Sequence, residues 1–280
     1  MGKKSALSLG GKELYMKVIL TGVAETSLIP LWAKASETQS AKPIIQDLKA
    51  VEMVEQIDYD FDKFKNSRLT QTGVAIRTWL LDSAAGAFIT KYPAANIINI
   101  GAGLDTRFAR VDNGQIKWFD LDLPEAIAVR SRFFSDTDRC RMIAKSVFDY
   151  SWLDEIHDKK APTLLIAEGI LMYFTETQVQ ELLTRLRDSF PHSQMLLETI
   201  SVFISKNSNQ HETLKKTGGR FSWGLNDGLE LERLAPGLKY IRQWNYFDYH
   251  RVRWGIMGLF GRFPPARKLV SNRIVHIALN

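Results

Sequence analysis

The sequence contains very little cysteine and no long hydrophobic run. Cys140 is the only cysteine among 280 residues, which excludes an internal disulfide and a cysteine-based zinc site. We therefore expect no metal centre and a reducing, cytoplasmic location. No apolar run approaches the ~20 residues needed to span a bilayer, and the first residues lack the apolar core of a signal peptide. The sequence thus predicts no membrane partner.

Charge is not concentrated in any one segment. The net charge is +6 and the isoelectric point is near 9.3, but the basic residues are spread along the chain. A scattered positive excess is more typical of solubility, or of acidic small substrates, than of a nucleic-acid footprint. We therefore expect no nucleic-acid partner.

The hydrophobic pattern changes at Pro93. Residues 1–92 are predicted to form an N-terminal helical lid, because residues 11–92 carry apolar residues mostly at helical spacing. After Pro93, short apolar runs typical of strands lie at residues 96–100, 116–122, 140–147, 163–169 and 194–200, with a last strand at 272–279. Helical stretches separate them, at residues 104–111, 124–134, 149–157 and 176–190. This alternation predicts an α/β fold with a parallel sheet and helices on both faces. Residues 201–252 of this 93–280 core are predicted to form a substrate-lid insertion.

The stretch NIINIGAGLDTRFAR, residues 96–110, leads from an apolar run into a glycine turn. Gly101 and Gly103 let the backbone turn tightly and approach a ligand, at the sheet edge where parallel α/β folds bind ligands. Asp122 follows Gly101 by 21 residues, at the end of the next strand, where a carboxylate can accept both hydroxyls of a ribose. Asp120 competes for this role. The pattern therefore predicts a ligand with an adenosine-like ribose.

Two cofactors carry such a ribose, a nicotinamide dinucleotide and S-adenosylmethionine. The dinucleotide fingerprint needs a third glycine that this sequence lacks. Asp105 also places negative charge in the turn where a pyrophosphate would bind. The sulfonium and ammonium groups of S-adenosylmethionine tolerate nearby acids. The residues thus favour S-adenosylmethionine, and a nicotinamide-dependent dehydrogenase is the alternative.

Three motifs together carry a family resemblance. IINIGAGLDTRFAR, FDLDLP and AEGILMYFTETQVQELL resemble the leucine carboxyl methyltransferase superfamily, and in particular its tetracenomycin-type polyketide O-methyltransferases. The resemblance implies a Rossmann-like class I methyltransferase with a seven-stranded, mostly parallel sheet whose last strand is antiparallel. After the fourth strand the chain has EGILMY, not the Asp/Asn-Pro-Pro-aromatic motif of enzymes that methylate nucleic-acid amines. Methylation of a base is therefore not expected.

The resemblance also implies which residues bind S-adenosylmethionine. Gly101 matches the family's cofactor-loop glycine, with Gly103 in the same turn, and Asp122 matches its ribose-binding acid in preference to Asp120. Arg77 and Lys34 match basic residues that bind the cofactor's carboxylate.

Three further positions complete the implied cofactor site. Glu168 matches an acid near the methionine part, and it also interrupts the most apolar strand, where a buried acid needs a partner. Ser146 and Val147 match the segment that lines the adenine, where relatives often have Asp followed by Leu. Asp149 is the alternative contact for the adenine.

No fixed catalytic side chain is expected, because methyl transfer mainly requires positioning of the reactants. Candidates for the substrate pocket are Tyr173, Phe221, Trp223 and His250. A carboxylate is ionised at neutral pH and needs no general base, and none of the five histidines lies in a recognised motif. We therefore expect methyl ester formation on a small, polyketide-like acid. The alternatives are a phenol or hydroxyl acceptor, with His211 or His250 as base, and a catalytically silent protein that binds S-adenosylmethionine.

Overall fold

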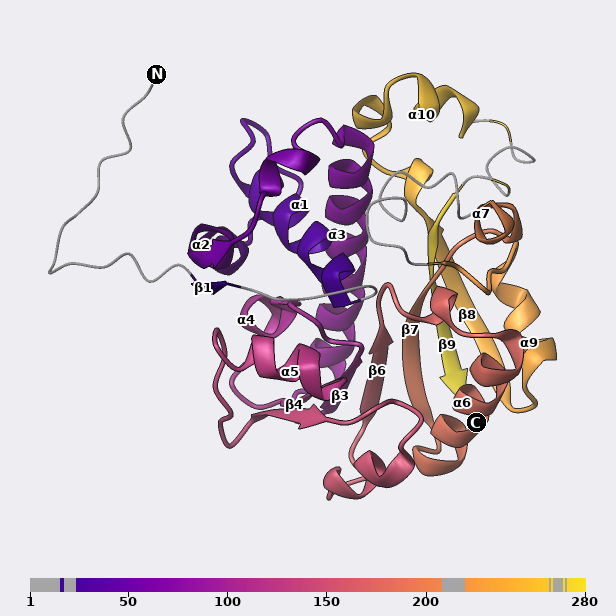
Figure 1. Cartoon of the computed structure of the whole chain (residues 1–280). Helices are drawn as coiled ribbons and strands as arrows, with labels where there is room; N and C mark the ends of the chain where they lie inside the picture. Colours follow the sequence, from indigo (N-terminus) through magenta and orange to yellow (C-terminus); the bar gives the residue numbers. More distant parts are fainter. Residues whose placement is uncertain (1–15, 18–23, 208–219, 262, 264–268, 270) are drawn as a thin grey trace, which may run out of the picture.

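The computed structural model describes residues 16–17, 24–207, 220–261, 263, 269 and 271–280. Its centre is a seven-stranded sheet of order β5-β4-β3-β6-β7-β9-β8 (Figure 1). The strands are β3 (Asn96–Ile100), β4 (Lys117–Asp122), β5 (Cys140–Ala144), β6 (Thr163–Ala167), β7 (Ser193–Thr199), β8 (Leu238–Asn245) and β9 (Arg273–Leu279). Strands β3 to β7 are parallel, and β9 runs antiparallel to both β7 and β8. The predicted seven-stranded, mostly parallel sheet is confirmed.

The stretches expected to be helical at residues 124–134 and 176–190 contain α-helices, and one long helix lies before the sheet. Residues 149–157 instead contain a 3-10 segment, and Met16–Lys17, within the N-terminal region expected to be mostly helical, form a short strand. The α-helices are α1 (Leu28–Thr38), α2 (Leu48–Gln56), α3 (Arg68–Lys91), α4 (Arg107–Val111), α5 (Pro124–Arg130), α6 (Glu176–Ser189), α7 (Val202–Lys206), α9 (Leu231–Leu234) and α10 (Ile256–Phe260). Short 3-10 segments are η1 (Ala24–Ser27), η2 (Phe61–Phe64), η3 (Tyr150–Glu155), η4 (Leu171–Tyr173), η6 (Gly228–Glu230), η7 (Tyr246–Asp248) and η8 (Arg251–Trp254). A two-residue parallel pair joins β1 (Met16–Lys17) to β2 (Ile57–Asp58). No helix in the described ranges is long and apolar enough to cross a membrane.

Helices cover both faces of the sheet because successive strand residues point to opposite sides. Ile98 and Ile100 of β3 belong to a core cluster that includes the apolar face of α6, whereas Ile97 belongs to a cluster with α3. All five residues of β3 are buried, as expected for a central strand of a parallel sheet. Cys140, the single cysteine, is buried at the start of β5.

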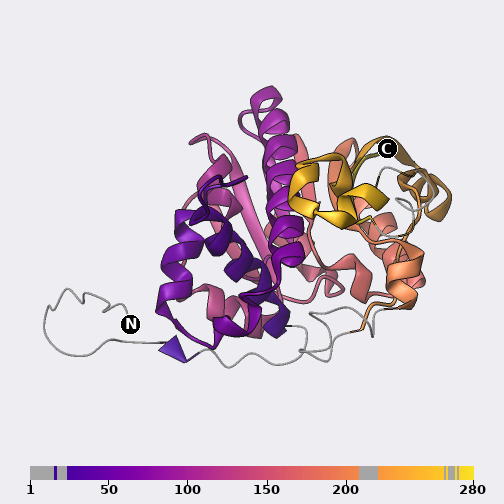
Figure 2. The same ribbon diagram turned by 90° about the horizontal axis from the view of Figure 1, so that it is seen from above.

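The N-terminal helices lie on one side of α3. Figures 1 and 2 show α1 and α2 together beside α3, with α10 on its other side. Leu31 and Met53, from α1 and α2, pack with Leu104 of the glycine turn and Val129 of α5. These helices are therefore anchored beside the carboxyl ends of β3 and β4, where the sequence predicts the ligand.

The segment predicted as a substrate lid, residues 201–252, contributes to the core of the fold, for example through Trp223 and Leu231. Residues 238–245 form β8, the edge strand of the main sheet, and therefore belong to the core. Residues 208–219, which include His211, lie outside the described residues.

Candidate active site

One cavity of about 790 Å³ lies at the carboxyl ends of the central strands. This volume is in the range of small-molecule sites. Six of the residues predicted to hold the cofactor line it, contributed by α1, α3, the glycine turn, β4 and the end of β6: Lys34, Arg77, Gly101, Gly103, Asp122 and Glu168. The fold thus brings together side chains that lie up to 134 positions apart in the sequence.

The glycine turn has the backbone geometry that only glycine adopts easily. Gly101 and Gly103 have φ values of +70° and +44°. A Cβ on Gly101 would lie 2.6 Å from Cδ1 of Ile170, and the Gly101 N–H donates to the Leu121 carbonyl at 2.8 Å. The turn is therefore held against β4 and packed tightly against the segment that follows Glu168.

Asp122, at the end of β4, lines the cavity and contacts the backbone of the glycine turn. Its Oδ2 accepts from the Gly103 N–H at 2.6 Å and its Oδ1 from the Leu123 N–H at 2.7 Å. Burial raises the pKa of Asp122 above its ordinary 3.8, and these two donors offset part of that effect. Asp120, the competing acid, is fully buried and pairs with Arg130 at 2.7 Å. Asp122, not Asp120, therefore faces the ligand space.

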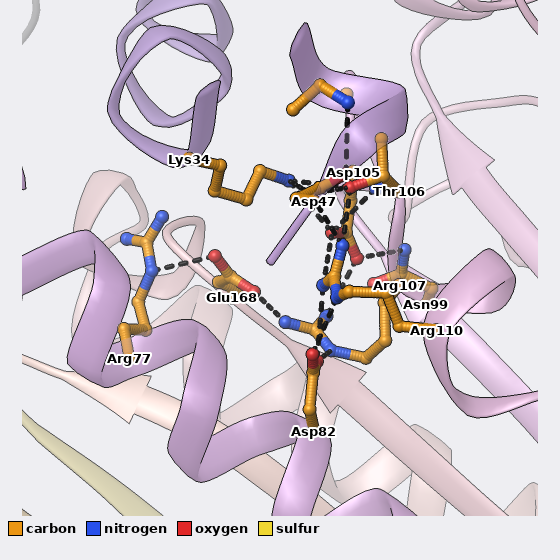
Figure 3. Close-up of polar contacts among 12 residues, drawn as sticks. Lys34, Asp47, Arg77, Asp82, Asn99, Asp105, Thr106, Arg107, Arg110 and Glu168 are labelled. Atoms are coloured by element: carbon orange, nitrogen blue, oxygen red, sulfur yellow. Dashed lines mark hydrogen bonds and ion pairs between the residues drawn. The ribbon is translucent and has the colours of Figure 1, made fainter. Parts of the chain in front are cut away.

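Glu168 is held between two arginines (Figure 3). Arg77 Nε lies 2.7 Å from its Oε1, and Arg107 Nη2 lies 2.5 Å from its Oε2. Burial alone would raise the pKa of Glu168, but the two guanidinium groups outweigh it and hold the pKa below the ordinary 4.5. Glu168 is thus an ionised carboxylate with a fixed orientation at the cavity wall.

Arg107 connects Glu168 to the rest of a buried charge network. Its side chain is 0% exposed, and its other nitrogens lie 2.7 Å from Asp82 on α3 and 2.7 Å from Asp105 in the glycine turn. Burial would raise the pKa of Asp105, but Arg107 and Lys34 hold it well below its usual range. Arg107 therefore connects α3, the glycine turn and the end of β6 through the carboxylates of Asp82, Asp105 and Glu168.

Lys34 belongs to the same network rather than standing alone at the surface. Its ammonium lies 3.3 Å from Asp105 and 3.2 Å from the Thr106 hydroxyl, and its side chain is 4% exposed. Asp47, which caps α2, pairs with Arg110 at 2.7 Å. Ion pairs thereby join α1 to the glycine turn and α2 to α4 (Figure 3).

Glu198 and Tyr246 are among the cavity residues that the sequence interpretation missed. Glu198, near the end of β7, accepts from Arg77 Nη1 at 2.9 Å and from the Tyr246 hydroxyl at 2.8 Å. Burial raises the pKa of Glu198 above its ordinary 4.5, although Arg77 partly offsets this. The signal for Glu198 was present, because it interrupts the apolar run QMLLETI as Glu168 interrupts TLLIAEG.

The part of the cavity beyond Arg77 and Glu198 is walled by aromatic and aliphatic side chains. Tyr173 and Phe221, both predicted pocket residues, line it with their ring centroids 5.4 Å apart. Phe247 and Trp254 also line it, and they pack on each other at 4.6 Å. The cavity therefore has a charged end at the glycine turn and an apolar, aromatic end.

Four other predicted residues are not among the described residues that line the cavity. Trp223 is buried in the core cluster with α6, and His250 packs edge-on against Trp79 at 5.7 Å. Val147 is buried in the same core cluster as Trp223, and Ser146 accepts from the Phe148 N–H. Asp149, the alternative to Ser146, is exposed and caps η3.

Comparisons with known proteins show the family of the chain. The family model described as leucine carboxyl methyltransferase matches residues 27–187. The chain is 33% identical over 230 residues to the tetracenomycin polyketide synthesis O-methyltransferase TcmP of Streptomyces glaucescens, which covers 82% of this chain and 85% of the relative. It is 31% identical over 261 residues to the S-adenosyl-L-methionine-dependent methyltransferase dpfgK of Gibberella zeae, covering 84% and 87%.

Solved structures are similar in fold. A DUF574 family protein from Streptomyces avermitilis matches with a TM-score of 0.61 at 12% identity, over 91% of this chain and 97% of that one. A putative methyltransferase from Thermobifida fusca matches with a TM-score of 0.55 at 12% identity, over 93% and 95%. At this identity the likeness establishes the class I methyltransferase fold alone.

Proposed function

The chain belongs to the leucine carboxyl methyltransferase family, and on this premise we propose that it methylates the carboxylate of an aromatic, polyketide-like small molecule. It is an S-adenosylmethionine-dependent O-methyltransferase related to TcmP. One observation carries the proposal: a single cavity contains both the charged end at the glycine turn and the aromatic end. The cofactor and the acceptor can therefore come into contact inside one cavity.

The charged end fits S-adenosylmethionine in shape and in charge. Gly101 and Gly103 line the cavity, so the backbone of the turn forms part of its wall, and the carboxylate of Asp122 suits ribose hydroxyls. The buried charge network has four cations and five carboxylates. The cations are Lys34, Arg77, Arg107 and Arg110, and the carboxylates are those of Asp47, Asp82, Asp105, Glu168 and Glu198. One excess carboxylate suits a cofactor whose net charge is positive.

We assign roles to the chain's residues on this basis. Asp122 would hold the ribose, Arg77 the cofactor's carboxylate through its planar guanidinium, and Glu168 the ammonium group. When bound, S-adenosylmethionine supplies the methyl group: its S–CH3 bond breaks, the electron pair stays on sulfur, and a carboxylate oxygen of the acceptor forms the new O–CH3 bond. The protein's contribution is to orient both reactants and to exclude water.

A carboxylate acceptor agrees with the side chains around the aromatic end. None of the described residues that line the cavity is a histidine. A carboxylate needs no base at neutral pH, because its ordinary pKa is about 4. Lys34 and Arg77 are the cations among these lining residues, and both are paired with carboxylates.

The test is a screen of aromatic acids and phenols with methyl-labelled S-adenosylmethionine. We expect a methyl ester, which mild alkali hydrolyses with release of labelled methanol. Single-turnover rates should change little between about pH 6.5 and 9, because the acid is ionised throughout. An alkali-stable product would contradict the carboxylate assignment.

Phenol methylation is the second candidate, and Glu198 favours it. A buried carboxyl with a raised pKa is a better proton acceptor than an ordinary one. A phenol acceptor would give an alkali-stable ether, and its rate would climb about tenfold per pH unit below the pKa of the accepting group.

A further inference from the structure

Glu198 occupies the boundary between the two ends of the cavity. One of its carboxyl oxygens contacts Arg77, on the cofactor side, and the other contacts Tyr246, which also lines the cavity. The Glu198 residue is 1% exposed, and its neighbours in the wall include Ile200 and Phe221. A carboxyl group in such surroundings is costly unless hydrogen-bond donors satisfy it.

The donors around Glu198 leave lone-pair sites on its carboxylate without a donor. A carboxylate has about four lone-pair sites, and Arg77 and Tyr246 occupy one on each oxygen. Their positions fix the carboxyl plane from two elements, α3 and η7. The fixed Glu198 carboxylate could therefore accept a hydrogen bond from a ligand group that approaches in a defined direction.

Arg77, which we assign to the cofactor's carboxylate, does not provide a second anion site for the acceptor at this boundary. Its guanidinium is shared between Glu168 and Glu198, so the three side chains together carry more negative than positive charge. Like charges repel more strongly beside a carboxylate that is withdrawn from water, as Glu198 is, than in bulk solvent. A carboxylate in the aromatic end is therefore disfavoured next to Glu198, whereas a hydroxyl is attracted to it by a charge-assisted hydrogen bond.

We propose that Glu198, oriented by Tyr246, is a specificity-determining residue that selects hydroxylated aromatic acids by accepting a hydrogen bond from an acceptor hydroxyl and directing the acceptor's carboxylate away from itself. This inference rests on the proposed function, because it names the class of acid that the aromatic end takes. The hydrogen bond to Glu198 would orient the acceptor, which contacts with the apolar side chains of the cavity alone would not do.

The experiment uses naphthoic acid and its monohydroxy isomers as probes. Binding of each acid to the protein saturated with S-adenosylhomocysteine is measured by calorimetry, for the wild type, Glu198→Gln and Tyr246→Phe. Glu181→Gln is the matched control, because Glu181 lies on α6 away from the cavity. Melting temperature and S-adenosylhomocysteine affinity of each variant report whether the fold and the cofactor end are intact.

We expect the wild type and Glu181→Gln to bind at least one hydroxy isomer about tenfold or more tighter than naphthoic acid. Glu198→Gln should lose this preference while its affinity for naphthoic acid stays the same or rises, and Tyr246→Phe should reduce the preference. Glu198→Asp, which keeps the charge, should restore part of it. A wild type without the preference, absence of binding by all probes, or a preference that survives in a folded Glu198→Gln variant would each overturn the assignment.

The proposed function is judged by a separate readout of the same samples. Methyl ester formation with S-adenosylmethionine tests the carboxylate reaction, whereas the binding preference tests Glu198. If hydroxy acids bind through Glu198 but yield ethers, the inference stands and the carboxylate reaction fails.

Discussion

Asp120 and Asp122 lie two residues apart on β4 but have different partners. Asp120 is fully buried, where it pairs with Arg130 and accepts from the Trp118 indole N–H at 2.8 Å. Asp122 ends the strand at the cavity, where its carboxylate accepts from the backbone N–H groups of Gly103 and Leu123. One acid therefore stabilises the fold, and the other is available to a ligand.

This difference predicts opposite outcomes for the two acids. Asp122→Ala should weaken S-adenosylmethionine binding by the ~1.5–3 kcal/mol of a lost charge-assisted hydrogen bond, about tenfold to a hundredfold in Kd. Asp120→Asn should instead lower the free energy of unfolding, because it leaves the Arg130 charge buried without its partner. Calorimetry and urea unfolding measure the two effects. Unchanged cofactor affinity in Asp122→Ala would contradict the ribose assignment.

Arg77 is predicted to matter for both cofactor binding and stability. Arg77→Lys should raise the Kd for S-adenosylmethionine and lower the melting temperature of the cofactor-free protein, because one ammonium cannot replace a guanidinium that contacts both Glu168 and Glu198. Arg77→Met should cost about 3–5 kcal/mol of unfolding free energy, since it removes the cationic partner of buried Glu198 and leaves Glu168 with Arg107 alone.

The matched control for Arg77 is Arg139→Met. Arg139 pairs with Asp112 at the surface, with a side chain 37% exposed, so its loss should lower the unfolding free energy much less than the loss of Arg77. Equal stability of the two methionine variants would show that the Arg77 pairs do not stabilise the fold.

The arginine-held carboxylates predict acid sensitivity. In the folded protein, the pKa values of Asp105 and Glu168 lie below their ordinary 3.8 and 4.5. Their stabilising contribution is therefore complete above about pH 4.5 and is lost as the pH falls toward the depressed folded values, because the unfolded chain then binds more protons. Urea unfolding at a series of pH values should show this decline. Glu168→Gln should flatten it, and an unchanged free energy from pH 7 to 3 would refute it.

Gly101 is predicted to tolerate no side chain. Gly101→Ala should cost about 1–3 kcal/mol of stability, because φ is +70° and the new Cβ would meet Ile170. It should also weaken cofactor binding, since the turn must shift. Gly86→Ala on α3 is the control: its Cβ would meet nothing within 4 Å, so it should stabilise the helix by up to about 1 kcal/mol. Equal melting temperatures for both variants would contradict this view of the turn.

The central strands and the glycine turn could be predicted because their signals are local. The runs NIINI and TLLIA became β3 and β6 at residues 96–100 and 163–167, since strands buried on both faces are apolar throughout. Strand β8 was harder: its residues alternate between buried and exposed irregularly, as an edge strand allows, and it was assigned to the lid.

The charge network could not be predicted, because its pairs join residues far apart in the chain. Glu168 was recognised as a buried acid in need of a partner, but its partners Arg77 and Arg107 are 91 and 61 positions away. Tyr246 offered no signal beyond an aromatic residue in YFDY. Trp223 and His250 were predicted to line the substrate pocket but pack against other parts of the protein. The sequence does not distinguish these two roles, because an aromatic or imidazole side chain in a loop-like stretch is compatible with either.

The buried position of Cys140 has a practical use. Burial raises the pKa of this thiol to about 12, and neighbouring Asp120 adds to the effect, so the thiolate that alkylating reagents attack is scarce at neutral pH. The wild-type protein can therefore serve as an unreactive background for site-directed labelling. A cysteine introduced at Val252, which is 95% exposed on η8 two residues from the cavity residue Trp254, would carry a fluorescent reporter of acceptor binding without removal of the native cysteine.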